Sequence, residues 1–209
     1  MKKLLHNRKY FINNIKENSD NNDDDFDITT NNVNDDDNQI YFYSSVTKDN
    51  ILTLSTKIKN KTNDLLSFSN VYRINKKNIN IYLNINSEGG DLFQSLLGYD
   101  IIKNNTIPIV TTVCGLCCSG ATFLSIVGKE RYIYPNSYML IHQLSTGVIG
   151  KYEDLKDEIY NCDNLMKIMK NIYSEHTKLP NKKLNEILKH DIYFSSKECL
   201  QYGLVDAIL

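Results

Sequence analysis

The chain has 209 residues, a formal net charge of −1 and scattered Lys and Arg, which favour one folded domain plus a tail and argue against a nucleic-acid-binding surface. Its five cysteines are an odd number and no signal-peptide pattern is present, so we expect free thiols and a cytoplasmic location, with an organelle or a viral host compartment as alternatives. No further Cys or His pair stands at zinc spacing from Cys114-x-x-Cys117, and we expect no metal site.

The first 38 residues differ in composition from the rest. Residues 1–16 are basic, and residues 18–38 are an Asn/Asp run with two Asp triplets. Such a segment has too little apolar surface to fold alone. We therefore predict a disordered arm at 1–38 and a folded domain at 39–209.

Strand and helix signals alternate along the folded part. Short apolar or alternating runs predict strands at 40–43, 79–86, 107–114, 131–134, 138–142 and 204–209. Apolar residues at helical spacing predict helices at 48–61, 92–104, 121–127, 152–178, 181–189 and 197–202, and residues 63–77 give no clear signal. Thr47, Asp91 and Ser196 are expected to cap three of these helices, and Gly203 to end the last one. This order predicts an α/β domain with a largely parallel sheet.

Residues 115–121, Gly-Leu-Cys-Cys-Ser-Gly-Ala, join a buried strand to a helix through a turn of small residues. This arrangement is typical of a nucleophile elbow, which exposes a serine at a helix N-terminus where free N–H groups can hold an oxyanion. Ser119 is the candidate nucleophile, and the alternative is a serine that only caps the helix. The surrounding stretch 107–128 is long and apolar enough for a membrane span, but its Pro, Gly and polar residues lead us to predict none.

A serine nucleophile needs a base, and the base needs a carboxylate that orients it. His142 ends an apolar strand and is the candidate base. Asp191 and Asp206 both qualify as the carboxylate, and spacing does not decide between them. The pair Gly89-Gly90 follows a strand, where it either presents an N–H to an oxyanion, pairs with an extended peptide or forms a plain turn.

Several motifs, in this order along residues 40–209, resemble the Clp protease proteolytic subunit family. They are Ile85-Asn-Ser-Glu-Gly-Gly90, Gly115-Leu-Cys-Cys-Ser-Gly-Ala121, Pro135-Asn-Ser-Tyr-Met-Leu-Ile-His-Gln143, His190-Asp191 and Glu198-Cys-Leu-Gln-Tyr-Gly-Leu-Val-Asp206. The resemblance implies the Clp protease/crotonase-like fold, with stacked β-α units and a protruding handle helix. The helix expected at 152–178 resembles that handle, and residues 146–150 resemble its strand.

The resemblance also implies a function for each matching residue. Ser119 matches the nucleophile, His142 the general base and Asp191 the third member of a triad, while N–H groups of Gly89, Gly90 and Gly120 match the oxyanion hole. Subunits of the family hydrolyse unfolded polypeptides inside a barrel of two stacked seven-subunit rings. An AAA+ unfoldase feeds the barrel, and the subunit itself needs neither ATP nor a metal or other cofactor.

The chain also departs from the family pattern. Glu88 replaces a Pro, Gly120 a frequent Met, His190 an Arg, and Asn84 an aromatic residue in a region that contributes to unfoldase docking. Three alternatives therefore stay open. They are a non-catalytic ring subunit that scaffolds active paralogues, an acyl-CoA enzyme of the crotonase type, and a virus-like protease that processes capsid proteins without an unfoldase.

Overall fold

A computed structural model describes residues 38–209, so all but the last residue of the predicted arm lie outside the described part. The strands are β1 Gln39–Phe42, β2 Ile81–Ser87, β3 Ile109–Cys118, β4 Arg131–Ile133, β5 Tyr138–Leu140, β6 Phe194–Ser195 and β7 Ala207–Ile208. The α-helices are α2 Lys48–Tyr72, α3 Leu92–Lys103, α4 Ala121–Ile126, α5 Tyr152–His176, α6 Asn181–Ile187 and α7 Ser196–Tyr202, with a 3-10 turn, η2, at Lys76–Asn78. The predicted α/β class is confirmed.

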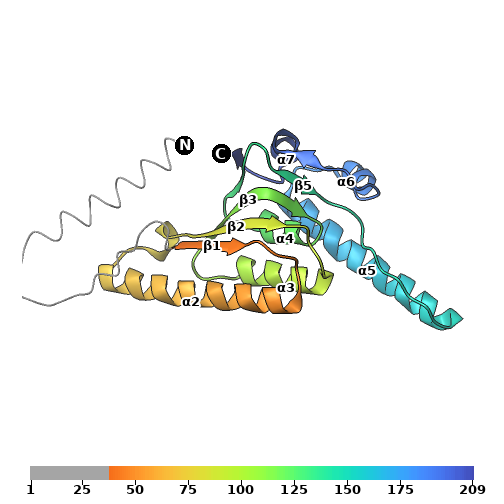
Figure 1. The fold of residues 1–209 in the computed structure, drawn as a ribbon, viewed down its shortest axis with the longest axis horizontal. Coiled ribbons are helices and arrows are strands. Elements are labelled where there is room, and N and C mark those ends of the chain that lie inside the picture. The colour runs from red at the N-terminus through yellow and green to blue at the C-terminus, as the bar shows by residue number, and fades with distance from the viewer. Residues whose placement is uncertain (1–37) are drawn as a thin grey trace, which may run out of the picture.

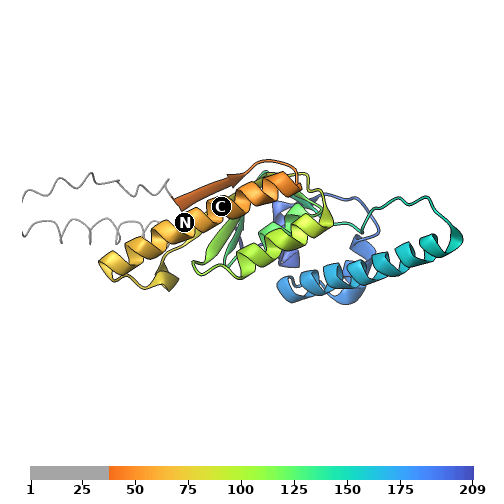
Figure 2. The same ribbon diagram turned by 90° about the horizontal axis from the view of Figure 1, so that it is seen from below.

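The sheet runs in the order β1-β2-β3-β4-β7 with every neighbouring pair parallel, as predicted. Its centre is apolar because Ile81, Leu83 and Ile85 of β2 alternate with more polar residues and are fully buried. Helices α2 and α3 lie side by side under one face of the sheet, whereas α5 projects away from the body of the protein (Figures 1 and 2).

The long strand β3 changes partners along its length. Residues 111–113 pair with β4, whereas residues 116–118 pair with β5, and Gly115, with φ of +94°, lies between the two segments. Its N–H donates to Ser137 Oγ at 2.7 Å, which fixes the switch point. The ends of β3 and β5 therefore lie together, and so do the residues that follow them, Ser119 and His142.

Some predicted boundaries are wrong. Helix α2 continues to Tyr72 through a polar segment whose buried positions keep helical spacing, and Arg73 ends it in a left-handed conformation. The cap of α7 is Ser195 and not Ser196, because Ser195 and Glu198 form a capping box there. The caps at Thr47 and Asp91 and the left-handed Gly203 are confirmed.

The strand expected at 146–150 is absent: residues 141–151 form neither strand nor helix in the described chain. This segment, which we call the strap, leads from β5 to the outer end of α5. A strand needs a ladder of backbone hydrogen bonds, and the strap makes a single one to a distant element, from the Gln143 N–H to the Leu188 carbonyl at 2.7 Å. Residues 144–150 pair with no strand within residues 38–209. None of the helices in that range has the length and apolarity to cross a membrane.

A polar cluster fastens the inner end of α5 to the body. The His176 Nε2 atom lies 2.9 Å from the Tyr99 hydroxyl, which accepts from Lys103, and Lys103 pairs with Glu175 at 2.9 Å. Arg131 donates to the carbonyl of His176. Burial lowers the pKa of His176, so the folded state holds this imidazole neutral.

This lowered pKa predicts a stability loss in mild acid. Stability from His176 is present above the unfolded-state pKa of about 6.5 and falls as the pH drops below it, because the unfolded chain then binds the extra proton. We expect the melting temperature to fall between about pH 7 and pH 5, and to fall less in His176→Gln. His190→Gln, which changes an exposed histidine, is the control. Equal pH dependence in all three proteins would contradict the prediction.

Candidate active site

Ser119 occupies a strained turn between β3 and α4. Its φ of +53° is in the left-handed region, which is costly for any residue except glycine. Two neighbours hold it there: its N–H donates to the Leu140 carbonyl at 2.8 Å, and its carbonyl accepts from the N–H and the hydroxyl of Thr122. The capping alternative is wrong, because Gly120 is the N-cap of α4 and no side chain caps that helix.

The structure brings Ser119, His142 and Asp191 together. Ser119 Oγ lies 2.7 Å from His142 Nε2, and His142 Nδ1 lies 3.1 Å from Asp191 Oδ1. The imidazole thus lies between the hydroxyl and the carboxylate, with one ring nitrogen toward each. Asp206 is elsewhere: its carboxylate accepts from the guanidinium and the N–H of Arg131.

The glycine turn after β2 lies against this site. The Val46 N–H donates to the Gly89 carbonyl at 2.7 Å, and the Val46 carbonyl accepts from the Asp91 N–H at 2.9 Å. Val46 and Gly90 are thus paired in the way that residues of two neighbouring parallel strands are. Gly89 and Gly90 have φ of +97° and +150°, and a Cβ on either would overlap a neighbouring backbone carbonyl oxygen. Glycine is therefore required at both positions.

The three candidate oxyanion donors are not equivalent. The N–H of Gly89 donates to Ser87 Oγ at 3.1 Å and is already used. No acceptor among residues 38–209 is recorded for the N–H groups of Gly90 and Gly120, and both residues line the same cavity as Ser119. Of the three N–H groups predicted for an oxyanion hole, those of Gly90 and Gly120 thus stay available within the described residues, whereas that of Gly89 has an acceptor.

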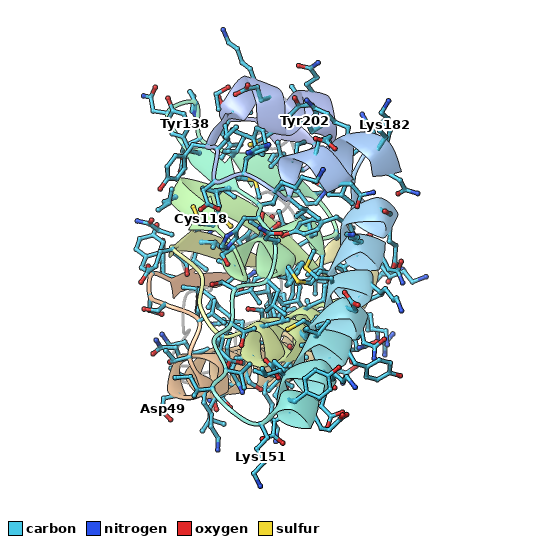
Figure 3. All side chains as sticks on the ribbon, turned by 90° about the vertical axis from the view of Figure 1, so that its right-hand side faces the viewer. Asp49, Cys118, Tyr138, Lys151, Lys182 and Tyr202 are labelled. Atoms are coloured by element: carbon cyan, nitrogen blue, oxygen red, sulfur yellow. The ribbon has the colours of Figure 1, made fainter. Side chains whose placement is uncertain are left out.

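A cavity of about 680 Å³ opens beside Ser119 and His142. The strap and the glycine turn with the start of α3 both contribute to its walls. Phe123, Leu165 and Met169 supply apolar lining. The strap is joined to α5 by a bond from the Leu144 N–H to the Met166 sulfur, at 3.3 Å. Figure 3 shows Cys118, the residue before Ser119, at mid-height on the left of the view, and α5 on the right, rising from the Lys151 end.

The cysteines around the serine are inert. Cys117 is fully buried, and burial raises its pKa. Burial likewise raises the pKa of Cys118 to about 11. Both are therefore neutral thiols near neutral pH, and neither competes with Ser119. All five cysteines are free, and the described residues contain no group of three or more His, Cys, Asp or Glu that could hold a metal ion.

Two comparisons with known proteins bear on the family of this chain. The family model for Clp protease matches residues 34–209. The chain is 29% identical over 170 residues to the ATP-dependent Clp protease proteolytic subunit of Deinococcus radiodurans, which covers 80% of this chain and 83% of that protein.

The chain belongs to the Clp protease family.

The Clp protease fold accounts for the sheet and for the projecting helix α5, which corresponds to the expected handle. Sequence reasoning missed the partners that support the site. Thr122 holds the Ser119 carbonyl and is itself hydrogen-bonded to the buried Tyr173 hydroxyl of α5 at 2.7 Å. Its position three residues after Ser119, on the first turn of the helix, is the signal that could have found it.

The packing around position 120 explains the glycine found there. A Cβ at position 120 would overlap the hydroxyl of Ser95, a fully buried residue of α3 whose Oγ donates to the Asp91 carbonyl at 2.7 Å. The Ser95 hydroxyl thus fills the space that a side chain at position 120 would occupy.

We expect Gly120→Ala to destabilise the protein by about 1–3 kcal/mol, the usual cost of overpacking, and to lower the reactivity of Ser119. Adding Ser95→Gly removes the overlapping hydroxyl and should restore most of the lost stability and most of the lost reactivity of Ser119. Urea unfolding and the rate of active-site labelling measure the two effects. Gly147→Ala is the control, since nothing lies within 4 Å of a Cβ there. Additive losses in the double variant would refute the pairing of Ser95 with Gly120.

Proposed function

We propose that the chain is a serine endopeptidase subunit that hydrolyses unfolded polypeptides through an acyl-enzyme. The observation that carries this proposal is the continuous contact from Ser119 Oγ through the His142 ring to Asp191 Oδ1. A hydroxyl, an imidazole and a carboxylate in this order form the minimum set for activating a serine. Membership of the Clp protease family supports the same reaction.

In the proposed reaction, Ser119 Oγ attacks the carbonyl carbon of the peptide bond while His142 Nε2 takes the hydroxyl proton. Asp191 stabilises the imidazolium, and the N–H groups of Gly90 and Gly120 stabilise the oxyanion. His142 then gives the proton to the leaving amine, which departs and leaves the acyl-enzyme. Water, deprotonated by His142, attacks the ester, and the carboxylic acid product leaves as Ser119 regains its proton.

The walls of the cavity suit an extended peptide. The glycine turn and the strap both line the cavity beside Ser119, and both are irregular backbone without a full set of ladder partners. A substrate added as a strand would pair with these edges, while one side chain enters the apolar part of the cavity. Folded proteins cannot present such a segment, which is why we propose unfolded polypeptides as substrates.

Self-association into a double heptamer is the proposed assembly. Tyr152, Ile159 and Tyr160 on α5 and Ile149 on the strap are mostly exposed, which is unusual for so many large apolar side chains on one projecting unit. Face-to-face stacking of two rings through these handles would bury them. It would also give the strap the strand partner that it lacks within the described chain.

An AAA+ unfoldase is the proposed partner, acting with the subunit in the cytoplasm. Asn84 lacks the aromatic ring expected there, but Tyr41 is its in-register neighbour on β1 and is exposed. Tyr41 makes an edge-to-face contact with the exposed Tyr43. These rings supply an aromatic surface beside position 84, which supports docking in spite of the substitution.

Labelling with a fluorophosphonate tests the catalytic proposal. We expect one adduct per subunit on Ser119, no adduct in Ser119→Ala, and labelling slowed by about 10²–10⁴-fold in His142→Ala, because the base is lost. Ser67→Ala, which changes an exposed serine of α2, should label normally. Intact-mass spectrometry measures the adduct. An unlabelled wild type would favour the non-catalytic scaffold, as would equal labelling of Ser119→Ala.

Assembly and substrate delivery are tested together. We expect native mass spectrometry to show a double heptamer, and the assembled protein to cleave short peptides without help. Casein should be degraded efficiently only after a purified AAA+ unfoldase and ATP are added, because the barrel admits threaded chains. Casein degradation that is unchanged by the unfoldase would instead favour a protease that acts without one.

A further inference from the structure

The cavity beside Ser119 carries negative charge with no compensating cation. Its lining includes the carboxylates of Asp91 and Glu158, and it includes no Lys or Arg. The Asp91 carboxylate is already used, since its Oδ1 atom caps α3 by accepting from Gln94 N–H at 2.9 Å. Asp91 thus belongs to the N-terminus of α3, whereas Glu158 is the one carboxylate that α5 contributes to the lining.

Glu158 and the apolar part of the cavity lie on one face of α5. Met169, Leu165, Cys162 and Glu158 occupy successive turns and all line the cavity. Met169 is buried at the inner end, where α4 also contributes Phe123. At 1.5 Å per residue, Glu158 lies about 16 Å further along the axis. The cavity is thus an elongated groove, apolar near α4 and acidic toward the handle.

The strap fixes the direction of the Glu158 side chain. Thr146 Oγ1 donates to Glu158 Oε1 at 3.0 Å, and the Cys162 thiol lies 3.8 Å from the same oxygen. For Oε2, no partner is recorded among the described residues. One carboxylate oxygen is therefore held by the strap while the other is left to accept a further hydrogen bond.

These features select for a particular peptide. Alternate side chains of an extended chain point the same way and stand about 6.6–6.8 Å apart. An apolar side chain in the Phe123–Met169 end places the side chain two residues away about 6.6–6.8 Å along the groove, short of the about 16 Å to Glu158, so a long side chain is needed to span the remaining distance. A Lys or Arg there lays its aliphatic stem on the groove and reaches a carboxylate with its charged end.

We propose that Glu158 gives this protease a preference for substrates with a basic residue two positions from the apolar residue held beside Ser119. This specificity rests on the proposed peptidase function. An acidic residue at the same position lowers kcat/KM through repulsion from Glu158 and Asp91. A neutral residue there gives a kcat/KM between those of the basic and the acidic residue.

Matched fluorogenic peptides test this. The set shares one apolar residue at the cleavage site and carries Lys, Gln or Glu at a single varied position on either side of it. We expect kcat/KM for Lys to exceed that for Glu by about tenfold at a position two residues from the apolar side chain, the order expected for a part-exposed charge pair. The Lys-to-Glu ratio should collapse toward one in Glu158→Gln and invert in Glu158→Lys.

Glu130→Gln is the matched control. It removes the same charge from an exposed site that does not line the cavity, and its Lys-to-Glu ratio should equal that of the wild type. High salt should reduce the wild-type ratio, since screening weakens a part-exposed pair.

Peptide binding to Ser119→Ala, followed by fluorescence anisotropy, separates the two proposals. Tighter binding of the Lys peptide that is lost in Ser119→Ala/Glu158→Gln supports the specificity even if no peptide is cleaved, which would refute only the peptidase function. Cleavage or binding with equal preference for Lys and Glu overturns the role of Glu158 and leaves the peptidase function intact. A Lys preference that survives Glu158→Gln overturns it as well.

Discussion

The pairing of β3 with β5 is the constraint on which the site depends. It places the Leu140 carbonyl where the N–H of Ser119 can donate to it, and this bond holds the serine in a left-handed turn. The same pairing delivers His142, two residues beyond Leu140, to the Ser119 hydroxyl. The strain in the turn is tolerated because several strong bonds over-determine it.

Support for this turn extends through the whole domain. Thr122 binds the Ser119 carbonyl and contacts the buried Tyr173 of α5, so the C-terminal, inner part of the projecting helix is attached to the serine turn. At the inner end of α5, the cluster around His176 and Arg131 ties the helix to the sheet edge. Hydrogen bonds therefore connect helix α5 both to the candidate active site and to the sheet.

Much of this was predictable from the sequence, because local patterns carry it. The alternation in β2, the small residues around Ser119 and the Gly89-Gly90 pair each reflect a backbone requirement that few residue types meet. The choice between Asp191 and Asp206 was not local: it depends on Arg131, distant in sequence, which occupies the Asp206 carboxylate.

Other features were missed for related reasons. The polar residues of the second half of α2 obscured its helical spacing. The predicted N-cap of α7 is one residue too late because two adjacent serines, Ser195 and Ser196, could both cap the helix. The strand expected at 146–150 depends on a ladder partner, and the strap finds no strand to pair with within residues 38–209, which the local sequence pattern does not reveal.

The two walls of the cavity are attached with unequal strength. The glycine turn is fastened through backbone amide-to-carbonyl bonds with Val46, whereas the strap is joined to α5 through a thioether, a weak acceptor, and one threonine hydroxyl. Beyond Gln143, whose N–H donates to the Leu188 carbonyl, the strap is therefore held less firmly than the glycine turn. Residues 144–150 are therefore the part of the cavity wall that can shift at least cost, while the glycine turn stays in place.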